Sequence, residues 1–137
     1  MSRSLLLSIA LAGFLAAAGG GRALADPFPV AAFSGLDKVT ATVTKFDAEV
    51  GKPKRFGGLE VTVRACDKNP PEDPPKTAAY VEIRQINLEN GQIEPQPIFK
   101  GWMFAESPGL NALEHPVYDV WLNTCKTASG SASSGKQ

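Results

Sequence analysis

The sequence has few of the residues on which common active sites depend. Among its 137 residues there is one histidine, His115, and there are two cysteines. It contains no phosphate-binding glycine loop, no dinucleotide fingerprint and no Gly-x-Ser-x-Gly nucleophile elbow. These absences favour a non-catalytic domain, and we expect it to use no cofactor.

Net charge is also almost absent. The chain has 14 Lys and Arg against 14 Asp and Glu. If Arg3 and Arg22 leave with an amino-terminal signal, 12 cations remain against 14 anions, which is a net charge of minus two. Nucleic-acid binding requires a clearly basic face, so we expect no nucleic-acid partner. The same balance gives no electrostatic attraction to an acidic membrane surface.

Residues 1–25 have the order of parts expected of a cleavable secretory signal. Arg3 is positively charged, residues 5–18 are apolar or small apart from one Ser, and three glycines follow at 19–21. In residues 23–25, Ala-Leu-Ala, the two alanines supply small residues at the two positions that a signal peptidase needs. A membrane anchor is the alternative, but a span needs roughly 20 apolar residues and the glycines cut this run short. We therefore expect an exported protein that does not span the membrane after cleavage.

Both cysteines, Cys66 and Cys125, lie after the cleavage site predicted before Asp26. An even pair in a small exported domain favours a structural disulfide. The bridge would close a loop of about 60 residues, worth roughly 4 kcal/mol in the chain-entropy model. A redox or metal-binding thiol pair is the alternative. A redox pair usually has Cys-x-x-Cys spacing, however, and a thiolate metal site requires more ligands.

Alternating apolar and polar residues predict β-strands through most of the mature chain. The predicted strands cover residues 39–44, 59–65, 80–85, 98–105 and 117–124. In the second strand, Leu59, Val61, Val63 and Ala65 are expected on one face. A change of parity after residue 85 predicts a bulge near Gln85.

Turn residues define the connections. Asn90-Gly91 predicts a tight hairpin turn with positive φ. Pro95 and Pro97 each lack the amide that a central strand donates, so the returning strand is expected to be an edge at first and to become regular around residues 98–105. One helical turn is expected within residues 110–114.

These features predict an all-β fold: a small antiparallel β-sandwich or partly open barrel with one disulfide, preceded by a cleavable signal peptide. The expected organisation is a signal peptide at 1–25, a spacer at 26–35, the all-β domain at 36–125 and a disordered Ser- and Gly-rich tail at 126–137.

Four segments carry a resemblance to a known family. They are residues 55–66, 70–75, 99–108 and 113–121, followed by Cys125. Together they resemble the DUF2155 family of small exported proteins, found mainly in alphaproteobacteria, across roughly residues 36–125. The resemblance implies a periplasmic location and the extent of the domain. It implies no enzyme, ligand or partner.

His115 is the residue on which any catalytic hypothesis depends. With Ser107 and Asp119 it supplies the parts of a nucleophilic triad, and with Glu114 and Asp119 the parts of a metal site. Neither set has a diagnostic spacing. Because His115 precedes a proline, it is expected to be extended, and its ring is expected to satisfy a nearby backbone group. We therefore expect no catalytic and no metal-ligating residue.

An aromatic set near the carboxyl terminus is the best candidate for a binding surface. Trp102 shares a strand face with Phe104, whereas Trp121 lies on the opposite face of the last strand from Tyr118. Core packing is the favoured interpretation, and an exposed platform for a sugar, peptide or partner protein is the alternative. The candidate ligand or partner surface comprises Trp102, Phe104, His115, Tyr118, Asp119 and Trp121.

Lys52, Lys54 and Arg55 form a small basic cluster. Three charges within one turn favour a solvated loop, and the acidic residues Glu72 and Asp73 are expected to offset them.

The sequence thus favours a non-catalytic periplasmic accessory or binding domain that docks on another cell-envelope component, either a protein or the cell wall. The alternative is a small periplasmic enzyme or metal-binding protein centred on His115, Asp119 and Ser107. A third hypothesis is a purely structural protein tied to peptidoglycan or to the outer membrane.

Overall fold

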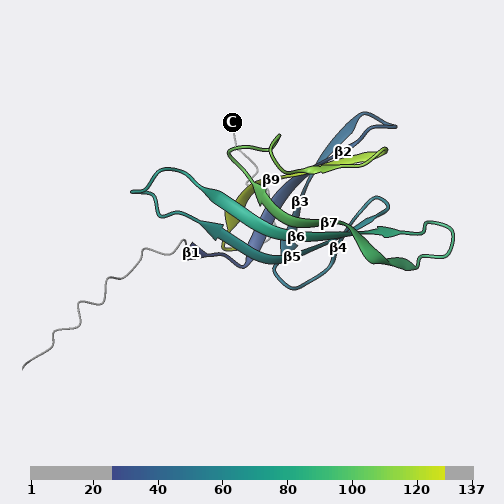
Figure 1. Ribbon diagram of the computed structural model, residues 1–137, viewed down its shortest axis with the longest axis horizontal. Coiled ribbons are helices and arrows are strands. Elements are labelled where there is room, and N and C mark those ends of the chain that lie inside the picture. The colour runs from purple at the N-terminus through teal and green to yellow at the C-terminus, as the bar shows by residue number, and fades with distance from the viewer. Residues whose placement is uncertain (1–25, 129–137) are drawn as a thin grey trace, which may run out of the picture.

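The computed structural model describes residues 26–128, in which all the regular secondary structure is β-strand. The strands, labelled in Figure 1, are β1 (Asp26–Pro27), β2 (Val30–Asp37), β3 (Thr42–Glu49), β4 (Lys54–Phe56), β5 (Leu59–Lys68), β6 (Thr77–Ile86), β7 (Ile93–Phe104), β8 (Leu113–Glu114) and β9 (Tyr118–Lys126).

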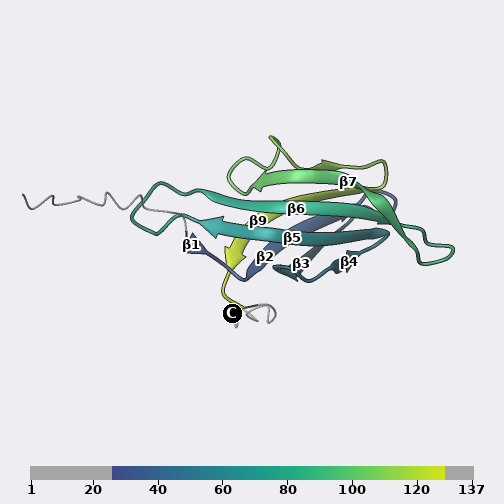
Figure 2. The ribbon, with the colours of Figure 1, turned by 60° about the horizontal axis from the view of Figure 1, so that its bottom comes forward.

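The strands form two antiparallel sheets packed face to face. The first sheet has five strands in the order β1-β5-β6-β7, with β4 also pairing β5. The second sheet has four strands in the order β3-β2-β9-β8. Figure 2 shows β5, β6 and β7 lying across the layer made by β2, β3 and β9. The predicted all-β sandwich is confirmed.

The strand β2 lies at the centre of the second sheet, between β3 and β9. Ala31 and Phe33 of this strand are fully buried. The prediction of a spacer over residues 26–35 is therefore wrong. Val-Ala-Ala-Phe does not alternate with polar residues, and a strand that is buried at positions of both parities, as here, need not do so.

The strand predicted at residues 39–44 is displaced by a turn. The side chain of Asp37 accepts hydrogen bonds from the backbone N–H groups of Val39 and Thr40, at 2.9 and 3.2 Å. Ala41 then has a φ of 55°. An Asp that bonds to the amides following it imposes a turn on the chain, even where β-branched residues would favour a strand. The strand β3 consequently begins only at Thr42.

The core lies between the sheets and is built from alternate residues of the long strands. Its fully or nearly fully buried side chains are Ala31, Phe33, Ala48, Leu59, Val61, Val63, Cys66, Ala79, Val81, Ile83, Met103, Leu113, Val120, Leu122 and Cys125. The predicted inward row of β5 holds from Leu59 to Val63 only. Ala65 is half-buried, and Cys66 takes its place in the core.

Two bulges bring the cysteines inward. In β5 the register with β6 shifts between Val63 and Ala65, and in β9 the register with β2 shifts across Asn123. Each extra residue reverses which parity faces the core. Cys66 and Cys125 therefore both point into the sandwich although the strand patterns alone would place them outside it.

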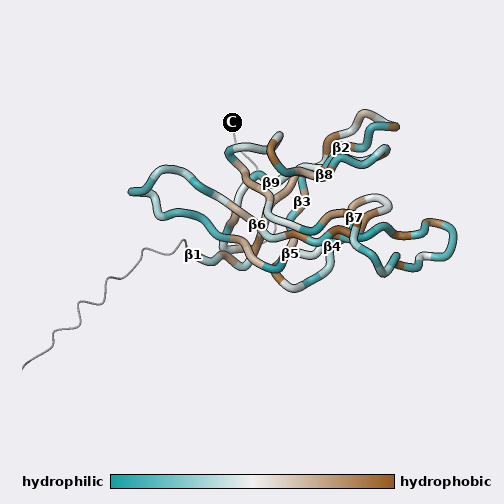
Figure 3. Tube along the Cα trace, viewed as in Figure 1, coloured by the Kyte–Doolittle hydropathy of each residue, from teal (hydrophilic) through white to brown (hydrophobic). Residues whose placement is uncertain are grey.

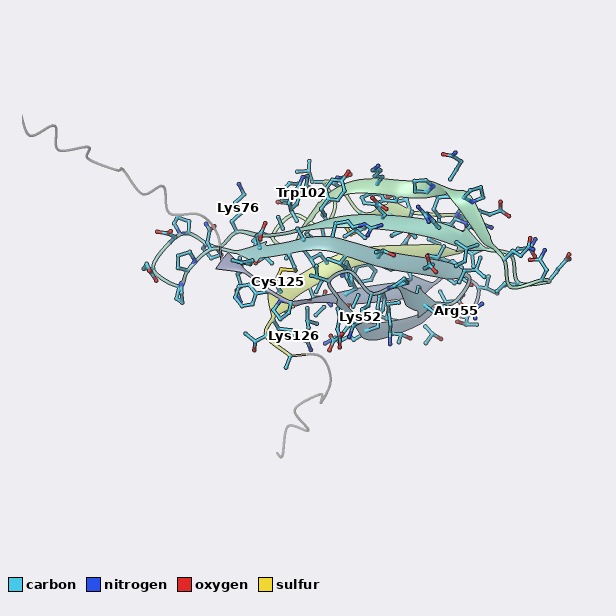
Figure 4. All side chains as sticks on the ribbon, turned by 90° about the horizontal axis from the view of Figure 1, so that it is seen from below. Lys52, Arg55, Lys76, Trp102, Cys125 and Lys126 are labelled. Atoms are coloured by element: carbon cyan, nitrogen blue, oxygen red, sulfur yellow. A yellow bond between two sulfur atoms is a disulfide. The ribbon has the colours of Figure 1, made fainter. Side chains whose placement is uncertain are left out.

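Cys66 and Cys125 form a disulfide with their Cα atoms 5.8 Å apart. It joins β5 of the first sheet to β9 of the second, and Figure 4 shows it between the two layers. The predicted structural disulfide is confirmed. No free cysteine remains among the described residues, so neither sulfur is present as a thiol that could bind a metal.

The hairpin between β6 and β7 was predicted correctly in place but not in length. The backbone N–H of Gly91 donates to the carbonyl of Asn87, and that of Asn87 donates to the carbonyl of Gln92. The loop between this pair has four residues rather than two, and Gly91 alone has positive φ, at 72°. The expected bulge near Gln85 is present as a register shift between Arg84 and Ile86. The strand β7 lies at the sheet edge, as Pro95 and Pro97 predicted.

The helical turn predicted within residues 110–114 is also wrong. Leu113 and Glu114 instead form β8 and pair with Val120 and Asp119 of β9. Burial of Leu113 in the core explains the difference, because it draws this segment onto the edge of the second sheet.

Large apolar side chains are also exposed at connections. Val39, Leu88 and Leu110 are each more than 70% exposed. Figure 3 shows hydrophobic positions both along the strands and at hairpin tips.

The signal peptide predicted at residues 1–25 and most of the tail predicted at 126–137 lie outside the described residues. Lys126, the first residue of that predicted tail, belongs to β9. Within residues 26–128, no helix is long and apolar enough to cross a bilayer.

Candidate functional site

The structure distributes the six residues of the predicted binding surface over three places. Trp102 and Phe104 lie on the outer face of the first sheet. Trp121 and Asp119 lie on the outer face of the second sheet. His115 and Tyr118 lie where β8 and β9 meet.

The outer face of the first sheet presents an aromatic group around Trp102. Trp102 pairs with Tyr80 across β7 and β6, and their rings meet edge to face with centroids 5.4 Å apart. Phe104 follows on the same face, as predicted, while Met103 between them is buried. Trp102 remains 40% exposed, so its ring is available for a partner to cover.

Charged residues border this aromatic group on the same face. Glu82 of β6 lies between Arg64 of β5, at 3.2 Å, and Lys100 of β7, at 3.9 Å. On the other side, the side-chain amide of Asn111 donates to the carbonyl of Trp102, which fixes the loop after β7 beside the strand. We call Tyr80, Trp102 and Phe104, together with this charged border, the Trp102 face.

Glu106 anchors the same loop to β6. Its carboxylate accepts the backbone N–H of Thr77 at 2.9 Å. Burial raises the pKa of Glu106, but the hydrogen bonds from Thr77 and the charge of Lys68 outweigh that effect. The pKa therefore lies below its ordinary value of 4.5.

His115 has a backbone role, as the sequence predicted. Its Nδ1 accepts the N–H of Val117 at 3.1 Å, and its ring stacks on Tyr118 with centroids 5.7 Å apart. Its carbonyl also accepts a hydrogen bond from the ammonium of Lys38. The imidazole nitrogen that a carboxylate would orient in a triad is thus already bonded to the chain itself.

Asp119 is committed to Lys38 and not to His115. The Lys38 ammonium lies 2.7 Å from Asp119 Oδ1. That oxygen is buried and accepts no hydrogen bond of good geometry, so the ion pair is what compensates its charge. Ser107 makes backbone hydrogen bonds in the loop after β7, and neither of them joins it to His115 or Asp119. The triad is not assembled.

The predicted metal-site alternative has no geometric support either. Glu114 pairs across strands with Asp119, whose carboxylate is held by Lys38. In the part of the chain that the structure describes, no three His, Cys, Asp or Glu side chains are grouped closely enough to hold a metal ion.

Trp121 occupies a polar environment on the second sheet. It pairs with Ser34 of β2, which is buried although polar. The side-chain amide of Asn123 donates to the Ser34 hydroxyl at 2.8 Å. Trp121 itself is half-buried, so it offers less free ring surface than Trp102.

A row of aromatic rings, which the sequence analysis missed, runs from the core to this end of the molecule. Phe33 stacks on Phe46 at 5.4 Å, Phe46 stacks on Phe56 at 5.2 Å, and Phe56 meets Tyr118 edge to face at 5.5 Å. The rings come from β2, β3, β4 and β9, so they connect the two sheets. Their separation in sequence concealed the row.

Glycines fit closely around these rings. A Cβ at Gly35 would lie 2.4 Å from the Phe56 ring, and one at Gly57 would lie 2.7 Å from the Tyr118 ring. Gly57 also has a φ of 54°. The Tyr118 hydroxyl accepts the N–H of Gly58 at 3.1 Å, which fixes the ring against the β4–β5 turn.

A basic groove lies beside this row, between β3 and β4. It consists of two adjoining open pockets with volumes of about 560 and 610 Å³, both lined by Lys45, Phe46 and Lys54. Lys52 lines the first pocket, and Arg55 the second. The basic cluster predicted from sequence therefore lines one side of a groove rather than forming an isolated loop.

The Glu72–Asp73 loop does not offset these charges by any ion pair. Lys52 instead pairs with Glu49 of β3. Lys45, Lys54 and Arg55 make no side-chain hydrogen bond or ion pair with any residue from 26 to 128. Sequence reasoning identified two of these three residues but missed Lys45, because only the fold brings β3 alongside β4.

The fold and these surfaces define a disulfide-linked all-β sandwich domain with an exposed aromatic face and a basic groove. The chain belongs to the DUF2155 family, described as an uncharacterized protein conserved in bacteria, whose model matches residues 31–125. It is similar to an uncharacterized protein of Rickettsia prowazekii (strain Madrid E), with 30% identity over 92 residues, 66% of this chain and 56% of that protein. The chain thus spans little more than half the length of this relative. No solved structure matches it.

Proposed function

We propose that the protein is a non-catalytic binding module of the bacterial cell envelope, located in the periplasm, that docks on another envelope component through the Trp102 face. The observation that carries this proposal is the 40% exposure of Trp102 on an edge strand, beside a second aromatic ring. Large aromatic side chains are enriched in protein interfaces, where they bury much area at little cost in side-chain entropy.

The surroundings of Trp102 also suit a docking surface. Tyr80 contacts the Trp102 ring, and Asn111 is hydrogen-bonded to its strand, so both are already ordered. Binding of a partner therefore costs little conformational entropy at this surface. The border of Arg64, Glu82 and Lys100 has both signs of charge. An apolar centre with a polar border is the usual composition of a protein interface.

The enzyme alternative lacks comparable support. His115 bonds to Val117, and Asp119 is paired with Lys38, so neither residue is poised to activate Ser107. Replacing His115 with Gln should therefore leave partner binding intact. An enzyme centred on His115 would lose its activity in this variant.

The proposal is tested by site-specific cross-linking in intact cells. A photoreactive amino acid placed at Lys100, next to Trp102 on the outer face, should yield a discrete adduct with an envelope protein or with cell wall. Trp102→Ala in the same chain should reduce the adduct at least about tenfold, as expected for loss of an interface anchor worth about 1.4 kcal/mol or more. Trp121→Ala is the matched control, because it removes the other tryptophan from the opposite sheet.

Two different results of the cross-linking experiment would contradict the proposal. Equal adducts in the Trp102→Ala and Trp121→Ala variants would overturn the assignment of this face. The absence of any adduct, from a chain that fractionates with the periplasm, would overturn the docking function itself.

The periplasmic location is proposed on residues 1–25 and on the disulfide. Disulfides persist in oxidising compartments and are rare in the bacterial cytoplasm. Fractionation of cells producing the full chain should recover a form that begins at Asp26 in the periplasmic fraction. Recovery of the uncleaved chain in the cytoplasm with both thiols reduced would contradict it.

A further inference from the structure

We propose that the basic groove between β3 and β4 binds an extended acidic polypeptide segment, which adds as a strand to the free edge of β3. This inference concerns a second surface and does not depend on the Trp102 face. Figure 4 shows Lys52 on the opposite side of the molecule from Trp102, with the disulfide of Cys125 between them.

The charges of the groove favour an anionic occupant. Lys45, Lys54 and Arg55 are exposed and have no ion pair among residues 26–128. The acidic residues that line the groove have other partners than these three cations. Asp37 accepts two amides of its own turn, Asp47 pairs with Lys126 at 2.6 Å, and Glu49 pairs with Lys52.

Glu60 is the remaining acidic residue to consider. It pairs with Arg55 across β4 and β5, yet the two side chains form no ion pair. Three cations therefore line one groove, and none of them forms an ion pair within residues 26–128. Such a cluster attracts an acidic partner and orients it as it approaches.

The backbone of β3 shows why that partner should be a polypeptide. Among the strands of residues 26–128, β3 is at the edge of the second sheet and pairs only with β2. The Val50 N–H donates to the Pro29 carbonyl, which continues the β2–β3 ladder by one residue pair. Because hydrogen-bonded and non-hydrogen-bonded pairs alternate in an antiparallel ladder, the backbone groups of Val43 and Lys45 point away from β2.

Those outward groups offer a specific template. A peptide strand can pair with the N–H and C=O groups of Val43 and Lys45, whereas a polysaccharide or a lipid headgroup has no matching repeat of amides. The side chain of Val43 is also exposed and adds apolar surface at this strand edge. An added strand would thus gain hydrogen bonds and apolar contact at one place.

The inner wall of the groove suits alternate apolar side chains of such a strand. Phe46 and Phe56 line it with stacked rings that are only partly buried. Side chains of an added strand would alternate between this aromatic wall and the outer side, where Lys45 lies. An alternating sequence of acidic and apolar residues therefore fits the groove best.

The first test uses a fluorescein-labelled nine-residue peptide in which Glu and Val alternate, with binding to the oxidised full-length protein followed by fluorescence anisotropy. We expect saturable binding that weakens as salt is raised. The triple variant Lys45→Gln, Lys54→Gln, Arg55→Gln should weaken it about tenfold or more at low salt, because surface charges are least screened there. Lys76→Gln is the matched control, since Figure 4 places Lys76 well away from Arg55.

Three comparison probes distinguish the possible occupants. A peptide of alternating Lys and Val should not bind, and a peptide with the same Glu and Val content in two blocks should bind more weakly. Stronger binding of polygalacturonate than of the alternating Glu and Val peptide would overturn the proposal in favour of an acidic glycan. No binding of any acidic probe would also overturn it.

The second test examines the backbone of β3. Hydrogen exchange measured by NMR should show the amides of Val43 and Lys45 becoming protected when the peptide binds, with no change at Thr44, which points toward β2. Val43→Pro removes one outward amide from an edge strand and should weaken binding, while the thermal midpoint checks that the variant is folded. Peptide binding with unprotected Val43 and Lys45 amides would refute strand addition. The variant Trp102→Ala should bind the peptide normally, which separates this proposal from the function proposed above.

Discussion

The disulfide between β5 and β9 should supply a large part of the stability of this domain. Replacing both cysteines by Ala releases a loop of 60 residues, counted from Cys66 to Cys125. In the chain-entropy model, such a loop corresponds to roughly 14 cal/mol/K of restricted unfolded-chain entropy, or about 4 kcal/mol at room temperature. Both sulfurs are buried, so their loss also leaves a small void that costs about 1 kcal/mol more.

Unfolding in guanidinium chloride, followed by tryptophan fluorescence, measures this loss. The double variant Cys66→Ala, Cys125→Ala should be less stable by about 4–5 kcal/mol, out of the roughly 5–15 kcal/mol typical of a domain. Its m-value should rise, because the unfolded chain without the cross-link exposes more surface. The reduced wild-type protein is the control, since it loses the cross-link while keeping most of the sulfur packing.

A loss below about 1 kcal/mol with an unchanged m-value would refute this reasoning. It would mean that the unfolded chain already keeps β5 and β9 close together, so that the bridge restricts it little. A large loss in the double variant but not in the reduced wild type would assign the effect to packing around the sulfurs instead.

Three further predictions concern single residues. Gly57→Ala should cost well over 2 kcal/mol in chemical denaturation, because it adds a clash with the Tyr118 ring to an unfavourable φ, whereas Gly91→Ala, with open space around it, should cost only about 1–2 kcal/mol. Equal losses would show that the ring simply moves aside. Tyr118→Phe should cost about 1–2 kcal/mol, since it leaves the buried N–H of Gly58 without a partner, and a neutral result would contradict that bond. Because the pKa of Glu106 is lowered by folding, its stabilising effect is present above pH 4.5 and is lost as the pH falls through the folded-state value. Glu106→Gln should therefore flatten the acid side of the stability profile, and a profile identical to that of the wild type would exclude this contribution.

The parts of the fold predicted from sequence are those set by local pattern. The strands around Val61 and Val81 were recognisable because apolar residues alternate with polar ones. The edge position of β7 followed from Pro95 and Pro97, which cannot donate to a neighbour. The disulfide followed from the number of cysteines and from the expected export of the chain.

The parts that were missed depend on tertiary contacts. Residues 30–35 do not alternate, because positions of both parities, Val30 and Ser34 as well as Ala31 and Phe33, are buried. The bulges at Arg64 and Asn123 have no local sequence signal, yet they decide that the cysteines face each other. The helical turn expected near Leu113 gave way to β8 because the core could bury that side chain.

The candidate sites likewise include one feature that local sequence predicts and others that depend on tertiary contacts. The backbone role of the His115 ring was predictable, since a residue before proline is extended and its side chain lies near the following amides. The basic groove was not predictable, because Lys45 and Arg55 come from strands of different sheets. Whether Trp102 is exposed depends on which face of β7 meets the core, and the sequence alone left that choice open.

The pairing of β2 with β9 determines when this protein is able to fold during synthesis. These two strands stand side by side in the second sheet, although they lie near opposite ends of the domain. A nascent chain therefore has a β2–β3 hairpin in which one edge of β2 stays unpaired until the last strand leaves the ribosome. Chains that end before Tyr118 should therefore remain sensitive to proteases. Chaperones that bind unfinished chains can act on this protein during nearly all of its synthesis.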